Sequence, residues 1–236
     1  MEQEAAQGLD YTVIYWIIFI GIAILSWVVS FALKRKFEKF SKEPIRMTGK
    51  EVAEKMLFEC GIDDVKVTCV PGSLTDHYNP LTKTVNLSES VYGCANVAAA
   101  AVAAHECGHA VQHQHAYAPL KLRSALVPVV QFSSSWVTWI ILIGLIMANH
   151  AGQVMLLVGI GLYAMITLFS FVTLPVEINA SQRAVNWLEE SGVVDREQKD
   201  MAVSALRSAA YTYVVAALSS LATLLYYILI FLGRRD

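Results

Sequence analysis

Three residues in the run His105-Glu106-Cys107-Gly108-His109 have the types and the spacing to hold and use a metal ion. Positions i and i+4 of a helix lie on one face, so His105 and His109 can direct two imidazoles at one ion. Glu106 then lies beside that ion without ligating it, and its carboxylate can take a proton from a water molecule there. This H-E-x-x-H arrangement is typical of zinc peptidases, although two surface histidines can share the spacing by chance.

The run of small residues before the motif predicts the helix that must position it. Residues 97–104 are six alanines and two valines, and alanine has the highest helix propensity. We therefore expect a helix from Asn96 to about His115, with the motif in its interior.

A catalytic zinc ion needs a third protein ligand, and two downstream residues are candidates. His115 has the spacing of the longer pattern H-E-x-x-H-x-x-G-x-x-H, but Gln112 stands where that pattern needs a glycine to turn the chain back. We interpret His113 and His115 as neighbours of the site. Glu177 is favoured, because two membrane crossings would return it to the face from which the motif helix departs. The alternative is an ordinary acid in the first turn of a helix that starts at Pro175.

Other polar residues could support the same chemistry. Ser181 and Asn179 could hydrogen-bond the ligands and fix their orientation. An oxyanion needs a further donor, and His77 and Tyr78 are candidates because the strand that carries them should pass the site. Arg183 is a weaker candidate. Ordinary turn or surface roles are equally consistent with these three residues.

Helix and strand signals precede the motif. Thr48-Gly49-Lys50-Glu51 has the form of a capping box that opens a helix to about Cys60. Residues 65–70, 74–78 and 82–87 predict three short strands. The edge of this sheet could bind a substrate backbone as an added strand, or the sheet could only brace the motif helix.

The chain is too apolar for a soluble domain. Only 16% of its 236 residues are charged and the mean hydropathy is +0.48, whereas about a quarter of a soluble domain is charged. Four stretches are long enough to cross a bilayer, which takes about 20 helical residues; they are 11–33, 127–147, 153–174 and 209–232. We expect a mainly α-helical integral membrane protein with four transmembrane helices and a small α+β, zincin-like metallopeptidase domain. Nothing in the composition indicates a nucleic-acid partner.

Basic residues predict the orientation in the lipid bilayer. Residues 34–126 carry twelve of the eighteen Lys and Arg, and residues 175–208 carry four. Both segments are therefore expected on the cytoplasmic side of the membrane. The acidic tail 1–10 precedes its apolar stretch, which is the wrong order for a cleaved signal peptide and suits an anchor that starts outside. Arg234 and Arg235 are the exceptions.

All four cysteines lie in the segment predicted to be cytoplasmic, where a reducing environment disfavours disulfides. Their spacings match no zinc-ribbon pattern. Cys107, inside the motif, is predicted to be a packing residue.

Several motifs together resemble one family. The segments 74–80, 105–113 and 173–184 resemble the YugP-like family of bacterial membrane-bound neutral zinc metallopeptidases. A membrane hairpin between the histidine motif and a downstream glutamate is also similar to the layout of the HtpX quality-control proteases and the CaaX prenyl proteases. The resemblance implies peptidase chemistry on peptide or membrane-protein substrates, and it leaves the cleavage preference and the oligomeric state open.

The main hypothesis is a membrane-embedded zinc endopeptidase of the gluzincin type with its site at the cytoplasmic face. His105, His109 and Glu177 would bind one Zn²⁺ per chain, and Glu106 would be the general base. One alternative is a zinc-binding membrane scaffold or adaptor, but a scaffold has no need of Glu106. Another is a site-2-type intramembrane protease, which buries its motif within a span and takes an aspartate as third ligand; here a long polar segment precedes the motif.

Overall fold

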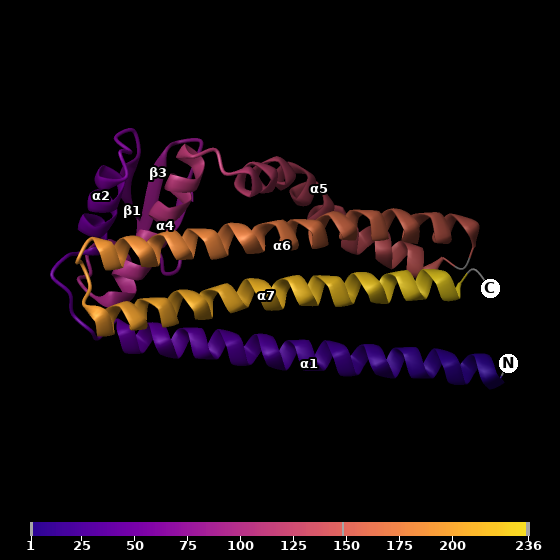
Figure 1. Ribbon diagram of the computed structural model, residues 1–236. Coiled ribbons are helices and arrows are strands. Elements are labelled where there is room, and N and C mark those ends of the chain that lie inside the picture. Colours follow the sequence, from indigo (N-terminus) through magenta and orange to yellow (C-terminus); the bar gives the residue numbers. More distant parts are fainter. Residues whose placement is uncertain (1, 148, 235–236) are drawn as a thin grey trace. The chain divides into compact units, whose positions relative to one another are not determined.

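The computed structural model describes residues 2–147 and 149–234 (Figure 1). The described residues form seven helices and three strands, and most of them are helical. In chain order the elements are α1 (Glu2–Phe40), α2 (Gly49–Glu59), β1 (Lys66–Val70), β2 (His77–Asn79), β3 (Thr84–Ser88), α3 (Glu89–Tyr92), α4 (Val97–Gln114), α5 (Ala118–Ile146), α6 (His150–Glu190) and α7 (Arg196–Gly233).

The chain divides into two compact units. The hairpin unit comprises the residues up to Val28, Leu122–Leu174 and the residues from Thr212 on. The site unit comprises Val29–Lys121 and Pro175–Tyr211. The predicted metal-binding residues all belong to the site unit.

Among the described residues, four helices are long and apolar enough to cross a membrane, as the composition predicted. They are α1 from Trp16 on, α5, α6 and α7. Their apolar windows have mean hydropathies between 1.8 and 2.4 and are mostly exposed in the isolated chain, as expected of surfaces that contact lipid. The four helices extend well beyond the predicted spans, so the boundaries of the spans and of the segments between them stay predictions.

The prediction that a helix starts at Pro175 is wrong. Pro175 lies inside α6, whose 41 residues continue without interruption from the apolar stretch to Glu190. An internal proline removes one helical hydrogen bond and costs about 3 kcal/mol. Beyond it, Val176, Ala180, Ala184 and Leu188 are completely buried on one face. Burial of this face offsets the cost of the proline and keeps the segment helical.

Helices α5 and α6 pack closely in the hairpin unit. A Cβ at Gly144 would lie 2.7 Å from the Leu156 nitrogen, and one at Gly159 would lie 2.5 Å from Ile141 Cγ1. Small residues at such crossings let two membrane helices approach each other.

Arg234, which departs from the charge pattern, caps a helix in the same unit. Its Nη1 donates to the Gly144 carbonyl (2.8 Å) and its Nη2 to the Leu145 carbonyl (2.6 Å), in the last turn of α5. A guanidinium satisfies carbonyls that a helix end leaves unpaired. Arg235 lies outside the described residues.

The three strands form one sheet in the order β1-β3-β2, so that β2 is an edge strand. Strand β3 pairs in parallel with β1 and antiparallel with β2. The predicted strand over 74–78 is displaced: β2 begins only at His77. Leu74 has a φ of 59°, which no strand tolerates. The Asp76 carboxylate instead accepts hydrogen bonds from the Ser88 amide (2.7 Å) and hydroxyl (3.0 Å), which draws the chain into a loop.

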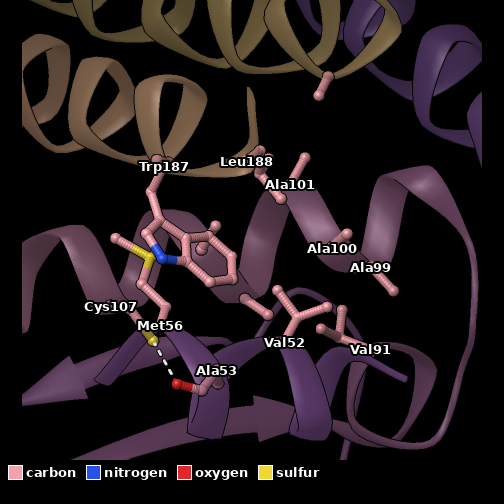
Figure 2. Packing of buried hydrophobic residues seen from close by; sticks show 14 of the residues in the cluster. Val52, Ala53, Met56, Val91, Ala99, Ala100, Ala101, Cys107, Trp187 and Leu188 are labelled. Carbon is pink, nitrogen blue, oxygen red and sulfur yellow. Dashed lines mark hydrogen bonds between the residues drawn. The ribbon is translucent and has the colours of Figure 1, made fainter. Parts of the chain in front are cut away.

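The core of the site unit lies between α2, the sheet, α4 and the end of α6 (Figure 2). Helix α2 begins at the predicted capping box, in which Thr48 and Glu51 bond each other's backbone amides. Its Val52 and Met56 are buried against the alanine face of α4, whose small side chains let the neighbouring elements approach. Cys107 packs in this core as predicted, with its thiol 3.6 Å from the Ala53 carbonyl, and all four cysteines are free.

We expect Leu87→Ala to destabilise the site unit by about 2–5 kcal/mol, the usual cost of truncating a fully buried leucine. Leu87, on β3, is 0% exposed, whereas Leu81, in the turn before it, is 93% exposed. Leu81→Ala is the matched control and should change stability by less than about 0.5 kcal/mol. Denaturant unfolding of the detergent-solubilised protein measures the change in the free energy of unfolding for each variant. Equal changes for Leu87→Ala and Leu81→Ala would contradict the described core.

Candidate metal centre

Helix α4 has the predicted bounds and carries the two histidines on one face. Asn96 is its N-cap, where the side-chain oxygen accepts a hydrogen bond from the Ala99 amide (2.9 Å), and His115 is its C-cap. The imidazoles of His105 and His109 lie with their ring centroids 4.9 Å apart. The i, i+4 spacing has therefore brought both rings to one place, as the sequence indicated.

The second element of the site is the segment of α6 after Pro175, which carries Glu177. Gly108 makes its approach possible, because a Cβ there would lie 2.6 Å from the Ala180 carbonyl oxygen. Glu177 is 2% exposed and faces the two histidines. The carboxylate therefore has little access to water and lies against the two imidazoles.

The ligand atoms of His105, His109 and Glu177 all lie within 4.8 Å of one another. Glu177 Oε2 is 3.2 Å from His105 Nε2 and 3.5 Å from His109 Nε2. Zinc bonds of about 2.0–2.1 Å in tetrahedral geometry separate neighbouring ligand atoms by about 3.3 Å. Two imidazoles and one carboxylate are also a donor set of catalytic zinc sites, in which water takes the fourth position. The residues present fit a zinc ion.

Ser181 supports this arrangement, as the sequence indicated. Its hydroxyl lies 3.1 Å from His105 Nδ1, so that His105 Nε2 is the nitrogen left for a metal. Asn179 does not play the predicted part directly: its side-chain oxygen accepts from Arg183 Nε (2.9 Å). Arg183 is thereby held along the surface of its own helix.

Glu106 lies beside the ligand cluster and is not a member of it. Its Oε2 accepts a hydrogen bond from the Tyr78 backbone amide (3.0 Å). Burial raises the pKa of the Glu106 carboxyl above its ordinary value; Glu177 adds to this effect and His105 opposes it. A carboxyl with a raised pKa is better matched to accepting and returning a proton near neutrality. The role of the Tyr78 amide was not predicted, because no side-chain pattern reports on a backbone donor.

The rings of the predicted oxyanion donors have other partners in this structure. His77 Nδ1 lies 2.7 Å from the Thr75 carbonyl oxygen, and His77 Nε2 lies 3.2 Å from the side-chain nitrogen Nδ2 of Asn86. The Tyr78 hydroxyl lies 2.8 Å from His113 Nδ1, and burial raises the pKa of this phenol. A role of His77 or Tyr78 at the oxyanion stays a prediction. Neither His113 nor His115 belongs to the ligand cluster found among the described residues.

Comparison with known proteins is consistent with this geometry. The sequence model of a family described as "Putative neutral zinc metallopeptidase" matches residues 15–232. The "Putative membrane protease YugP" of Bacillus subtilis (strain 168) is 41% identical over 225 residues, which cover 93% of this chain and 98% of that protein. No solved structure matches the chain.

We expect Gly108→Ala to separate the two helices of the site. A methyl group there meets the backbone of Ala180, so the histidines must move away from Glu177. A displacement of about 1 Å can lower a catalysed rate by about 100-fold, and zinc affinity should fall as well. The measurements are peptide hydrolysis and zinc competition with a chelator.

Gly93→Ala is the matched control, because a Cβ there meets nothing within 4 Å and the φ of Gly93 is −98°. Gly93→Ala should leave the rate of peptide hydrolysis and the zinc affinity unchanged. Equal behaviour of the two variants would contradict the close contact at Gly108.

Proposed function

We propose a function from the premise that this chain belongs to the family of neutral zinc metallopeptidases, as the resemblance of its motifs predicted. The chain is proposed to be a membrane-embedded zinc endopeptidase of the gluzincin type, with a zincin-like site unit. His105, His109 and Glu177 would hold one Zn²⁺ per chain. The observation that carries the proposal is that the ligand atoms of these three side chains lie within 4.8 Å of one another, although His105 and Glu177 are 72 positions apart in the sequence.

The proposed mechanism assigns the proton transfers to Glu106. When bound, zinc lowers the pKa of water and polarises the scissile carbonyl. Glu106 accepts a proton from the attacking water and delivers it to the nitrogen of the leaving amine. The hydrogen bond from the Tyr78 amide holds the Glu106 carboxylate in place for both steps.

The edge strand offers a way to bind an extended substrate. Strand β2 pairs with β3 on one side only, and its Tyr78 amide points at Glu106 instead of at β3. A peptide added beside β2 would run past the general base and would bond edge groups other than the Tyr78 amide, which already donates to Glu106. This mode of binding requires no particular side chain, which suits unfolded peptides or membrane-protein segments as substrates.

The chain is a membrane protein, and the site is proposed to face the cytoplasm at the inner membrane. Its four apolar helices and its similarity to the putative membrane protease of B. subtilis support its assignment as a membrane protein. The excess of Lys and Arg in residues 34–126 supports the proposed cytoplasmic orientation of the site. Helix α4 is not among the four helices that could cross a bilayer, which argues against a site-2-type intramembrane protease. The buried Glu106 beside the ligands argues against a scaffold without hydrolytic activity.

Replacing Glu106 by Gln tests the general base. Glu106→Gln keeps the shape of the side chain and removes its ability to accept a proton, so we expect peptide hydrolysis to fall by about 100-fold or more. The zinc content should stay near one ion per chain, because Glu106 is outside the ligand cluster. Glu54→Gln, on the exposed face of α2, is the control. Unchanged turnover of zinc-loaded Glu106→Gln would exclude Glu106 as the base.

Removing Glu177 tests the third ligand. Glu177→Ala leaves two histidine ligands, so zinc affinity should fall by more than the roughly 10–100-fold that loss of an outer partner costs. Glu190→Ala removes an exposed carboxylate from the same helix and should have no effect. Competition with a chromophoric chelator measures the zinc affinity of each variant. If Glu177→Ala bound zinc as tightly as the wild-type protein, another side chain would have to complete the site.

A further inference from the structure

Gln112 is a completely buried polar residue that the proposed chemistry does not use. It lies one turn after His109 in α4, is 0% exposed, and faces the segment of α6 that carries Glu177. A buried amide without partners would cost about 1–3 kcal/mol. Its hydrogen bonds therefore define what this residue does at the site.

The orientation of the Gln112 amide follows from a partner that can only accept. One end of the amide lies 2.8 Å from the Val176 carbonyl oxygen, so this end must be Nε2. The second hydrogen of Nε2 points to Asn179 Oδ1 at 3.0 Å. The other end of the amide, toward His109, is then the oxygen Oε1.

This orientation determines the tautomer of His109. Gln112 Oε1 lies 3.1 Å from His109 Nδ1, and an amide oxygen can only accept, so Nδ1 carries the hydrogen. The neutral ring then has its lone pair on Nε2, the atom that lies 3.5 Å from Glu177 Oε2. Ser181 contacts the corresponding nitrogen of His105. Each histidine thus has a partner that leaves its Nε2 for the metal.

The same amide also connects the two helices of the site. Val176 directly precedes Glu177, and Asn179 follows it by two positions, so Gln112 bonds the chain on both sides of the proposed ligand. Asn179 is itself held by Arg183 Nε. We propose that Gln112 is a positioning residue: it keeps His109 in the metal-binding tautomer and holds the backbone of Glu177 at the distance that a zinc ion requires. This inference rests on the proposed metal site.

Gln112→Met tests the inference, because methionine has a similar length and volume but forms none of the three hydrogen bonds. We expect zinc affinity, measured by competition with a chelator, to fall about 10–100-fold. The visible spectrum of the Co²⁺-substituted protein should change, since it reports the ligand geometry. Gln114→Met is the matched control: Gln114 lies two residues on and donates to the Gly61 carbonyl, so both readouts should stay unchanged.

A second pair of variants decides the question if Gln112→Met fails to fold. Asn179→Ala removes one acceptor of the Gln112 amide and should lower zinc affinity, by less than Gln112→Met would. Asn179→Asp keeps an oxygen at that position and should restore the affinity. Equal zinc affinities for Asn179→Ala and Asn179→Asp would overturn the inference.

The outcomes also separate this inference from the proposed function. If Gln112→Met unfolds more easily but keeps its zinc affinity and Co²⁺ spectrum, Gln112 has only a structural role and the inference fails alone. If Glu177→Ala loses zinc while Gln112→Met does not, the metal site stands and the inference again fails. If the unchanged protein binds no zinc, the inference and the proposed function fail together.

Discussion

The close contact between α4 and the segment of α6 after Pro175 is the constraint on which the site depends. Gly108 provides the space, since any side chain at this position would meet the Ala180 carbonyl. The contact brings a carboxylate from one helix against two imidazoles from the other. Because the interior of a folded domain is closely packed, the helices cannot separate slightly and still keep the ligand atoms about 3.3 Å apart.

Burial then controls the chemistry of the polar groups around this contact. Glu106, Glu177 and Gln112 are all buried, and a buried polar group is unfavourable unless it has a partner. Glu106 accepts from the Tyr78 amide and Gln112 donates to the Val176 carbonyl, while Glu177 lies against the two imidazoles with which it would share the metal ion. These partners restrict each side chain to one orientation. Such orientation is what a hydrolytic site requires, because the reacting groups need not reorganise during the reaction.

The rest of the site unit supplies the rigid surroundings of these groups. The alanine face of α4 packs against α2 and the end of α6, and β2 lies near enough to the motif to donate its amide to Glu106. The same strand lies at one edge of the sheet. The proposed general base and the proposed binding edge are therefore coupled by one hydrogen bond, so that a substrate on β2 would be positioned relative to Glu106 by the backbone.

Local patterns in the sequence determined the helix of the motif with its approximate bounds, the capping box at Thr48 and the four apolar helices. Each of these follows from helix propensity, side-chain capping or hydropathy over a few neighbouring residues. For this reason the histidine pair and Glu106 could be identified without a structure, and family resemblance added the peptidase class.

Only the tertiary structure decided the features that depend on residues far apart in the chain. The sequence favoured Glu177 over His115 as third ligand, but its meeting with the histidines depends on packing between residues 72 positions apart. Burial of Val176, Ala180 and Ala184 keeps α6 helical through Pro175, where local rules predicted a helix start. The bonds from Ser88 to Asp76 shortened the second strand. Gln112 gave no local signal, because its role depends on a carbonyl 64 positions away. Long-range packing and buried hydrogen bonds outweigh local preference at these places, since each involves partners that a short window of sequence does not contain.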